Sequence, residues 1–274
     1  NLIMSLVNTD WIEKNIDKLK IIDCSWHMPS VERDGHKEYL ESHIENAKFF
    51  DLDKNSDQKT DLPHMLTNYE EWEKIVSKMG ITNDDEIVIY DNSDVLSSCR
   101  CWYNFIYFGH NNKLVHILDG GLKKWKLEGK PTTTKIFKTK TTKYIASERK
   151  NLVKNKSQIN ENIIKQEFKI VDARSRERFE GKVEEPRKGL KSGSIPKSMC
   201  IPFRELINDD NTFKNEDEIL NIFKNTLGKE TTTNIVFSCG SGVTAAVLSL
   251  AYSLINNKYM PTIYDGSWAE YGKN

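Results

Sequence analysis

The chain has 274 residues, its 40 Lys and Arg balance 40 Asp and Glu, and its mean hydropathy is −0.61. This length is enough for two domains of ordinary size. Zero net charge argues against nucleic-acid binding through gross positive charge. No apolar run approaches the roughly 20 residues that span a bilayer. We therefore predict neither a nucleic-acid nor a membrane partner.

The cysteines predict a reducing compartment. They are five, an odd number, and they are scattered along the chain rather than paired as in a disulfide scaffold. The first residues, NLIMSLVNTDW, lack the basic segment and the long apolar core of a secretory signal. We expect a cytoplasmic protein, with a mitochondrial one as the alternative if a transit peptide has been removed. Cys99 and Cys101 have no second pair or histidine cluster nearby, so we interpret them as structural and expect no metal or other cofactor.

Strands and helices alternate along the first half of the chain. In order we expect a helix capped at Asn8, Thr9 or Asp10, strand 20–23, helix and turn 39–44, strand 47–51, helix 69–79, strand 86–90, helix 98–108, strand 115–118 and helix 122–127. Such alternation predicts an α/β fold, with a mostly parallel sheet that has helices on both faces.

The second half repeats the first. Three motifs recur at offsets of 149, 148 and 146 residues: Ile170-Val171-Asp172 after Ile21-Ile22-Asp23, the strand ending at Cys239 after the strand ending at Asp91, and Asp265-Gly266 after Asp119-Gly120. Three matches at nearly one spacing indicate a duplicated fold. We predict domains at 1–138 and 153–274 and a linker at 139–152. The linker lies in a Thr- and Lys-rich stretch, 130–156, whose alternative interpretation is an edge extension packed on the first domain.

The stretch 235–254 predicts the reactive group. A short buried strand, 235–238, precedes Cys239-Gly240-Ser241-Gly242-Val243, and a helix is expected over 244–254. Two glycines allow the loop to fold around one atom, and a following helix N-terminus adds partial positive charge there. This arrangement favours a thiolate at Cys239. The alternative is a buried, inert structural cysteine.

Other cysteine chemistries fit the loop less well. A cysteine phosphatase needs an arginine at the end of such a loop to bind phosphate oxygens, and Ala245 stands there. A redox pair needs a second cysteine nearby, and the loop has none.

The run CGSGVTA, residues 239–245, resembles the active-site loop of the rhodanese superfamily, and specifically of its 3-mercaptopyruvate sulfurtransferases. Thiosulfate sulfurtransferases of the same build usually have basic residues within this loop, where the present chain has Gly240 and Ser241. The resemblance covers nearly the whole chain and implies two tandem rhodanese-like domains. Because Asp91 stands where the second domain has Cys239, it also implies a non-catalytic N-terminal domain and a catalytic C-terminal one.

The resemblance also implies roles for particular residues. Arg178 and Arg187 match the family's substrate-binding arginines, and a guanidinium fork suits a carboxylate. Their alternative interpretation is solvated surface charge, and we expect neighbouring Arg174 to pair with a buried carboxylate instead. The implied catalytic residues are Cys239, Ser241, His64 and Asp53, the last two from the first domain. The implied substrate-binding residues are Arg178, Arg187, Gly240, Gly242, Val243 and Thr244.

The implied activity is transfer of the sulfane sulfur of 3-mercaptopyruvate, through a Cys239 persulfide, to a thiol acceptor such as thioredoxin, a small thiol or cyanide. Pyruvate and hydrogen sulfide would be released, and the enzyme is expected to be a monomer. Two alternatives stay open: a thiosulfate sulfurtransferase, which passes sulfur from thiosulfate to cyanide, and a non-catalytic rhodanese binding module.

Overall fold

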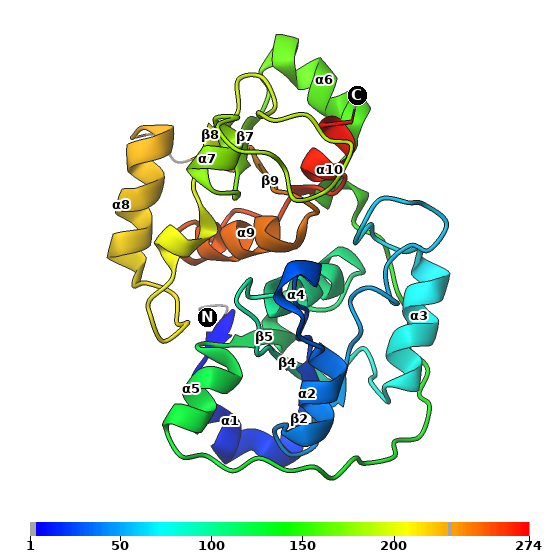
Figure 1. The fold of residues 1–274 in the computed structure, drawn as a ribbon. Helices are drawn as coiled ribbons and strands as arrows, with labels where there is room; N and C mark the ends of the chain where they lie inside the picture. The colour runs from blue at the N-terminus through cyan, green and yellow to red at the C-terminus, as the bar shows by residue number, and fades with distance from the viewer. Residues whose placement is uncertain (1–3, 230–231, 274) are drawn as a thin grey trace. The chain divides into compact units, whose positions relative to one another are not determined.

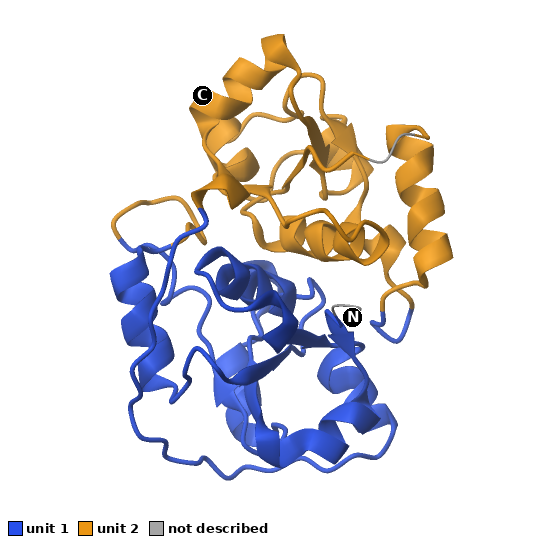
Figure 2. Ribbon diagram, turned by 180° about the vertical axis from the view of Figure 1, so that it is seen from behind, with its two compact units in different colours: residues 1–58, 67–149, 209–212 blue, residues 59–66, 150–208, 213–274 orange. Residues whose placement is uncertain are grey.

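The computed structural model describes residues 4–229 and 232–273. Contacts divide the chain into two compact units (Figure 2). The first contains residues 1–58, 67–149 and 209–212, and the second contains residues 59–66, 150–208 and 213–274. Each unit therefore includes a short segment whose neighbours in the sequence belong to the other.

The first unit is built on a parallel five-stranded sheet in the order β1-β5-β4-β2-β3 (Figure 1). Its strands are β1 (Leu6–Val7), β2 (Leu19–Asp23), β3 (Lys48–Phe49), β4 (Glu86–Tyr90) and β5 (Val115–Leu118). Its helices are α1 (Thr9–Asn15), α2 (Gly35–Glu41), α3 (Tyr69–Lys78), α4 (Ser98–Tyr107) and α5 (Gly121–Leu127), with short 3₁₀ turns η1 (Ile16–Lys18), η2 (Pro29–Val31) and η3 (Asn112–Leu114).

Helices cover both faces of this sheet because alternate strand side chains point to opposite sides. On one side, Val88 of β4 packs in a cluster with Ile12 of α1 and Trp125 of α5. On the other, the Trp72 ring of α3 stacks on Phe108 at the end of α4, with 4.7 Å between ring centroids.

The second unit repeats this topology with the parallel strand order β6-β10-β9-β7-β8. Its strands are β6 (Val153–Lys154), β7 (Lys169–Asp172), β8 (Met199–Cys200), β9 (Ile235–Ser238) and β10 (Ile263–Tyr264). Its helices are α6 (Lys156–Lys165), α7 (Arg176–Phe179), α8 (Glu216–Leu227), α9 (Val243–Ile255) and α10 (Ser267–Tyr271), with 3₁₀ turns η4 (Lys150–Leu152) and η5 (Phe203–Leu206). Ile159 of α6 packs on one face, while Phe223 of α8 and Tyr252 of α9 pack on the other.

The predicted α/β fold with two similar halves is confirmed, and most predicted elements lie within one residue of the observed bounds. Three differences are local. Strands β1 and β6 were not predicted, because two-residue strands show no periodicity. Strand β3 is shorter than the expected 47–51. Helix α2 begins at Gly35 rather than near Tyr39, because the Asp34 side chain accepts a hydrogen bond from the Lys37 amide and caps it there.

Residues 130–149 of the Thr- and Lys-rich stretch belong to the first unit and are hydrogen-bonded to it. The Thr142 amide donates to the Ser77 carbonyl at 3.0 Å. The Ser147 amide likewise donates to the Phe108 carbonyl at 2.9 Å. The Thr142 and Ser147 amides are thus satisfied although neither residue lies in a helix or strand.

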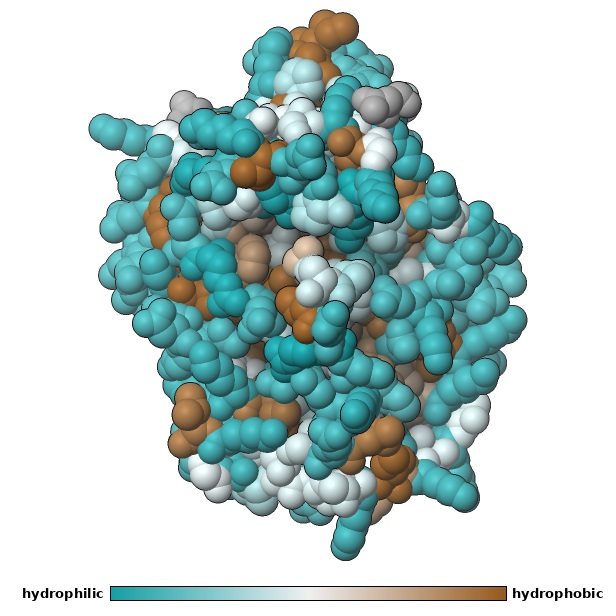
Figure 3. Space-filling view, in the orientation of Figure 1, coloured by the Kyte–Doolittle hydropathy of each residue, from teal (hydrophilic) through white to brown (hydrophobic). Residues whose placement is uncertain are grey.

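Hydrophilic side chains cover most of the face drawn in Figure 3, with apolar residues scattered among them. Among the residues that the structure describes, we find no helix that combines the length and the apolar character needed to cross a membrane.

Candidate active site

Cys239 directly follows β9, which is hydrogen-bonded to a strand on each side, and the chain then turns into α9 (Figure 1). The carboxyl ends of parallel strands are the usual location of binding sites in such sheets. The Cys239 residue is only 1% exposed. Its sulfur accepts a hydrogen bond from the Gly242 amide at 3.0 Å. Gly242 caps α9 with a positive φ of 86°, a conformation that a residue with a Cβ adopts at a cost.

The predicted loop residues therefore occupy the start of α9. Val243 and Thr244 are its first two residues, so the positive end of the helix dipole lies close to the thiol. Gly240 and Ser241 form the turn between Cys239 and the Gly242 cap.

Helix α10 holds the same loop from outside. The Cys239 amide donates to the Ser267 hydroxyl at 3.1 Å, and that hydroxyl donates to the Tyr264 carbonyl at 2.8 Å. The Trp268 amide donates to the Cys239 carbonyl at 2.9 Å. Sequence reasoning missed Ser267 as a residue of the site, although the recurring Asp-Gly pair just before it marks the segment.

Ser241 and His64 lie together in the second unit. The His64 Nδ1 and the Ser241 Oγ are 2.9 Å apart, and both residues are buried. The segment 59–66 is tied to this unit by two further contacts. The Leu66 amide donates to the Asp265 carboxylate at 2.7 Å, and the Lys273 ammonium lies 3.6 Å from the Asp61 carboxylate. His64, expected from the first domain, thus belongs by its contacts to the unit that contains Cys239.

Asp53 lies in the first unit. The indole of Trp26 reaches its carboxylate, with the nitrogen 3.1 and 3.2 Å from the two oxygens.

Arg178 and Arg187 both reach the backbone of Gly240. A Cβ built on this glycine would lie 3.2 Å from Arg178 Nη2 and 3.2 Å from Arg187 Nη1. Two guanidinium ends therefore meet beside the residue that follows Cys239. A carboxylate placed there would accept hydrogen bonds from positively charged donors on both sides.

A buried charge network lies behind these arginines. Arg174 pairs with buried carboxylates, as the sequence predicted: it binds Asp172 at 2.7 Å and lies 3.2 Å from Glu185. Its guanidinium stacks over the Trp268 ring. Burial alone would lower the pKa of Arg174, but its two carboxylate partners outweigh burial and raise it. This arginine is therefore charged and structural.

In the first unit, an aspartate occupies the position that corresponds to Cys239. Asp91 follows β4 as Cys239 follows β9, and its carboxylate accepts hydrogen bonds from the Ser93 amide at 3.0 Å and the Ser98 amide at 2.9 Å. Burial raises the pKa of Asp91. A carboxylate thus occupies the place of a sulfur and is satisfied by its own loop.

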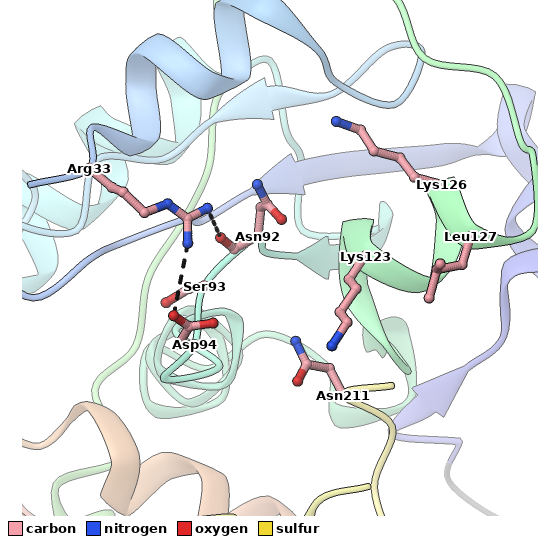
Figure 4. Close-up of a pocket in the computed structure, with 8 residues that line it drawn as sticks. All are labelled: Arg33, Asn92, Ser93, Asp94, Lys123, Lys126, Leu127 and Asn211. Atoms are coloured by element: carbon pink, nitrogen blue, oxygen red, sulfur yellow. Dashed lines mark hydrogen bonds and ion pairs between the residues drawn. The ribbon is translucent and has the colours of Figure 1, made fainter. Parts of the chain in front are cut away.

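A cavity of about 370 Å³ opens beside that loop (Figure 4). The lining residues are Arg33, Asn92, Ser93, Asp94, Lys123, Lys126, Leu127 and Asn211. Arg33 donates to the Asn92 carbonyl at 3.2 Å and lies 3.9 Å from the Asp94 carboxylate. Its charge is already engaged within the first unit.

The remaining cysteines take no part in this geometry. All five cysteines are free and buried. Cys99 and Cys101 lie within α4 and are fully enclosed. Residues 4–229 and 232–273 contain no cluster of at least three His, Cys, Asp or Glu side chains that could hold a metal ion.

The site thus has a cysteine in an amide-lined turn at the end of a central parallel strand, with guanidinium groups beside it. These features define a class of α/β protein in which a cysteine sulfur can act as a nucleophile and carry a transferred sulfur atom. The model of the rhodanese-like domain matches residues 8–128 and 155–274. The chain therefore belongs to the rhodanese-like family, as the loop resemblance implied, and it contains this domain twice.

Relatives match along nearly the whole chain. An Arabidopsis thaliana protein named thiosulfate/3-mercaptopyruvate sulfurtransferase 1, mitochondrial, is 38% identical, over 97% of this chain and 75% of its own length. The mouse 3-mercaptopyruvate sulfurtransferase is 34% identical, over 98% and 92%. The crystal structure of the Escherichia coli 3-mercaptopyruvate sulfotransferase SseA aligns with a TM-score of 0.84 at 31% identity, covering 97% of this chain and 99% of its own.

Proposed function

We propose that the protein is a 3-mercaptopyruvate sulfurtransferase that acts through a persulfide on Cys239. The observation that supports this most directly is the pairing of two groups. The Cys239 sulfur accepts the Gly242 amide, and the guanidinium ends of Arg178 and Arg187 meet beside Gly240. One group suits a sulfur that bears negative charge, and the other suits the carboxylate of an α-keto acid. The names of the relatives agree with this substrate.

In the first half-reaction the Cys239 thiolate attacks the sulfur of 3-mercaptopyruvate. An S–S bond forms, the C–S bond breaks, and its electron pair stays on carbon as the enolate of pyruvate. A proton converts the enolate to pyruvate. Arg178 and Arg187 hold the carboxylate and the keto oxygen, and the Gly242 amide stabilises charge on the sulfur. Gly240, Val243 and Thr244 shape the turn that receives the outer sulfur.

In the second half-reaction a thiol attacks the outer sulfur of the persulfide. The S–S bond to Cys239 breaks, the thiolate is regenerated, and the acceptor leaves as a persulfide. A second thiol then releases hydrogen sulfide from that acceptor and forms a disulfide. Thioredoxin and small thiols are the acceptors we propose, and cyanide would give thiocyanate. Two separate half-reactions predict ping-pong kinetics.

Ser241 and His64 are proposed to supply the proton that the enolate takes up. Their hydrogen bond places an imidazole 2.9 Å from a hydroxyl two residues beyond Cys239. In this scheme Asp53 contributes its charge to the same relay. Which partner of the His64–Ser241 hydrogen bond donates depends on the tautomer of the imidazole. The scheme therefore names the two proton-transfer groups and not the order in which they pass the proton.

We propose that residues 1–138 form the non-catalytic domain, that 139–152 link it to the second, and that 153–274 form the catalytic domain. The self-satisfied Asp91 carboxylate supports the first assignment. A monomer in the cytoplasm is our further proposal. Five free, buried cysteines suit a reducing compartment. One plant relative is named as mitochondrial, so fractionation of cells should compare both compartments.

The decisive experiment compares kcat/KM for 3-mercaptopyruvate and thiosulfate with one thiol acceptor. We expect mercaptopyruvate to be preferred about 100-fold, or about 2.7 kcal/mol, because the guanidinium ends of Arg178 and Arg187 suit a planar carboxylate, while Gly240 and Ser241 add no basic side chain to the loop for thiosulfate. A preference for thiosulfate would favour the second activity that the plant relative's name contains. Activity on neither substrate would favour a binding module.

The persulfide itself is tested on the Cys239→Ser variant. Treating the wild-type chain with substrate and no acceptor should add the mass of one sulfur atom, and the variant should add nothing. Full activity in the variant would contradict the mechanism.

A further inference from the structure

Glu185 contacts both Arg174 and Arg178 in the second unit, and the sequence analysis did not single it out. Its side chain is only 1% exposed. The carboxylate accepts from Arg178 Nε at 2.9 Å and from Arg178 Nη2 at 2.8 Å. Its Oε1 also lies 3.2 Å from Arg174 Nη1. One buried carboxylate thus contacts both a structural arginine and the arginine assigned to the substrate.

The contact with Glu185 uses one particular edge of the Arg178 guanidinium. Two parallel hydrogen bonds occupy the Nε–Nη2 edge, the geometry that fixes a guanidinium plane most firmly. The end of the group remains directed toward Gly240, where Arg178 Nη2 is 3.2 Å from the position of a Cβ. Without Glu185, rotation about the long arginine side chain would scatter that end over many rotamers.

The charges along this chain of contacts balance before substrate arrives. Asp172 and Glu185 carry two negative charges, and Arg174 and Arg178 carry two positive ones. Removal of Glu185 would therefore leave excess positive charge on Arg174 and Arg178 in a largely buried place.

We propose that Glu185 is a positioning residue for the substrate: its buried carboxylate holds the Arg178 guanidinium so that its end faces the turn after Cys239. The inference rests on the proposed function, because it takes Arg178 to bind the carboxylate of the substrate. Arg174 and Asp172 support the arrangement by holding Glu185 from behind.

The test compares Glu185→Gln with Glu205→Gln in the full chain. Glutamine keeps the size of Glu185 but turns one acceptor into a donor that faces the Arg178 N–H groups. Glu205 is the control, because it also pairs with an arginine of α7 but on the exposed surface: its two carboxylate oxygens accept from Arg176 Nη2 at 3.1 and 2.8 Å. We expect KM for 3-mercaptopyruvate to rise about 10-fold in Glu185→Gln, with kcat within about 3-fold. We expect no change in Glu205→Gln.

A double mutant separates positioning from a merely structural role. If Glu185 acts through Arg178, adding Glu185→Gln to Arg178→Ala should raise KM no further. Additive increases, or a fall in kcat that matches the rise in KM, would overturn the inference. Should Glu185→Gln fail to fold, Glu185→Asp keeps the charge beside Arg174 but shortens the reach to Arg178, and it should show the same rise in KM. An unchanged KM in a folded Glu185→Asp variant would also overturn it.

Binding of pyruvate, measured by calorimetry, distinguishes this inference from the proposed function. Pyruvate presents the same carboxylate and keto oxygen and requires no turnover. A wild-type chain that transfers no sulfur would overturn the proposed function, while weaker pyruvate binding in Glu185→Gln would still support positioning. Equal pyruvate binding in the wild type and Glu185→Gln would overturn the inference even in an active enzyme.

Discussion

Single residues in the second unit show how far chemistry can be predicted from sequence alone. The kind of partner that Arg174 has, a buried carboxylate, was predicted, and Asp172 at the end of the preceding strand is one such partner. Glu185 and Ser267 were missed, because their partners Arg178 and Cys239 are brought to them by turns that local patterns do not determine. The alternation of Arg and Glu over 176–187 was the available signal for Glu185.

Arg187→Ala should weaken substrate binding with little effect on the stability of the protein. The guanidinium end lies beside Gly240, so its loss should remove a charged hydrogen bond to the substrate carboxylate, a contribution of about 1.5–3 kcal/mol. We expect KM for 3-mercaptopyruvate to rise about 10-fold or more, measured by steady-state kinetics. Arg204→Ala, at an exposed arginine of η5, is the control. An unchanged KM in Arg187→Ala would remove this residue from the site.

His64→Ala and Ser241→Ala should each lower kcat, because each removes one partner of the same 2.9 Å hydrogen bond. Proton transfer by a positioned group contributes about 100-fold or more, so a fall of that order is expected in each. The double variant should be no slower than the slower single one. His36→Ala, at an exposed histidine of α2, should behave as the wild type. Single variants with the rate and pH profile of the wild type would show that the pair transfers no proton.

At the scale of elements, the long strands and helices were predictable and the turns between them were only partly so. Strands of four or five residues, such as β4 and β9, show a buried apolar run in the sequence. The two-residue strands β1 and β6 owe their conformation to pairing with β5 and β10. The turn after Cys239 was predicted from its two glycines, which the structure places in different roles.

Those two glycines predict different defects on substitution by alanine. Gly242 has a φ of 86° and donates to the Cys239 sulfur. Gly242→Ala should therefore lose about 1–2 kcal/mol of stability and also lower kcat. Gly240 needs no positive φ, but its Cβ would lie 3.2 Å from both arginine ends. Gly240→Ala should therefore raise KM while stability stays close to that of the wild type.

Chemical unfolding and steady-state kinetics on both variants provide the measurement. The prediction fails if the two substitutions change stability and KM in the same way. Equal defects would mean that the loop responds as one rigid piece rather than through two separate contacts.

At the scale of the whole molecule, the internal repeat predicted two similar α/β halves, and the units share one strand order. The repeat did not predict the contacts of segment 59–66. This segment belongs to the second unit because its Leu66 amide binds Asp265 and its His64 ring binds Ser241. These partners lie 199 and 177 residues further along the chain. Duplication also places Asp23 of the first unit where the second has Asp172, and the two carboxylates differ in their partners.

Asp172 is paired with an arginine, whereas Asp23 is held by neutral groups. Asp23 is 1% exposed and accepts from the Ser25 amide at 2.9 Å and the Ser25 hydroxyl at 2.6 Å. Burial raises the pKa of Asp23 to about 7, and the charge of Asp91 adds to the rise, while hydrogen bonds from Ser25 and Tyr90 oppose it. At the duplicated position, the first unit therefore has a carboxyl group whose pKa lies near neutral pH.

This titration predicts how stability depends on pH. The folded chain holds a proton on Asp23 up to about pH 7, while the unfolded chain releases it near pH 4. Between these values the folded state binds more protons than the unfolded state, so stability falls as pH rises and then levels off above pH 7. The fall amounts to about 4 kcal/mol over that window for this group alone.

Asp23→Asn is neutral at every pH and should remove this fall in stability, whereas Glu41→Gln, at an exposed residue of α2, should not. Urea unfolding at pH 5 and pH 8 measures the difference. If the wild type and Asp23→Asn lose equal stability between these two pH values, the Asp23 carboxyl is ionised in the folded chain at both, and the neutral groups around it are enough to hold a buried charge.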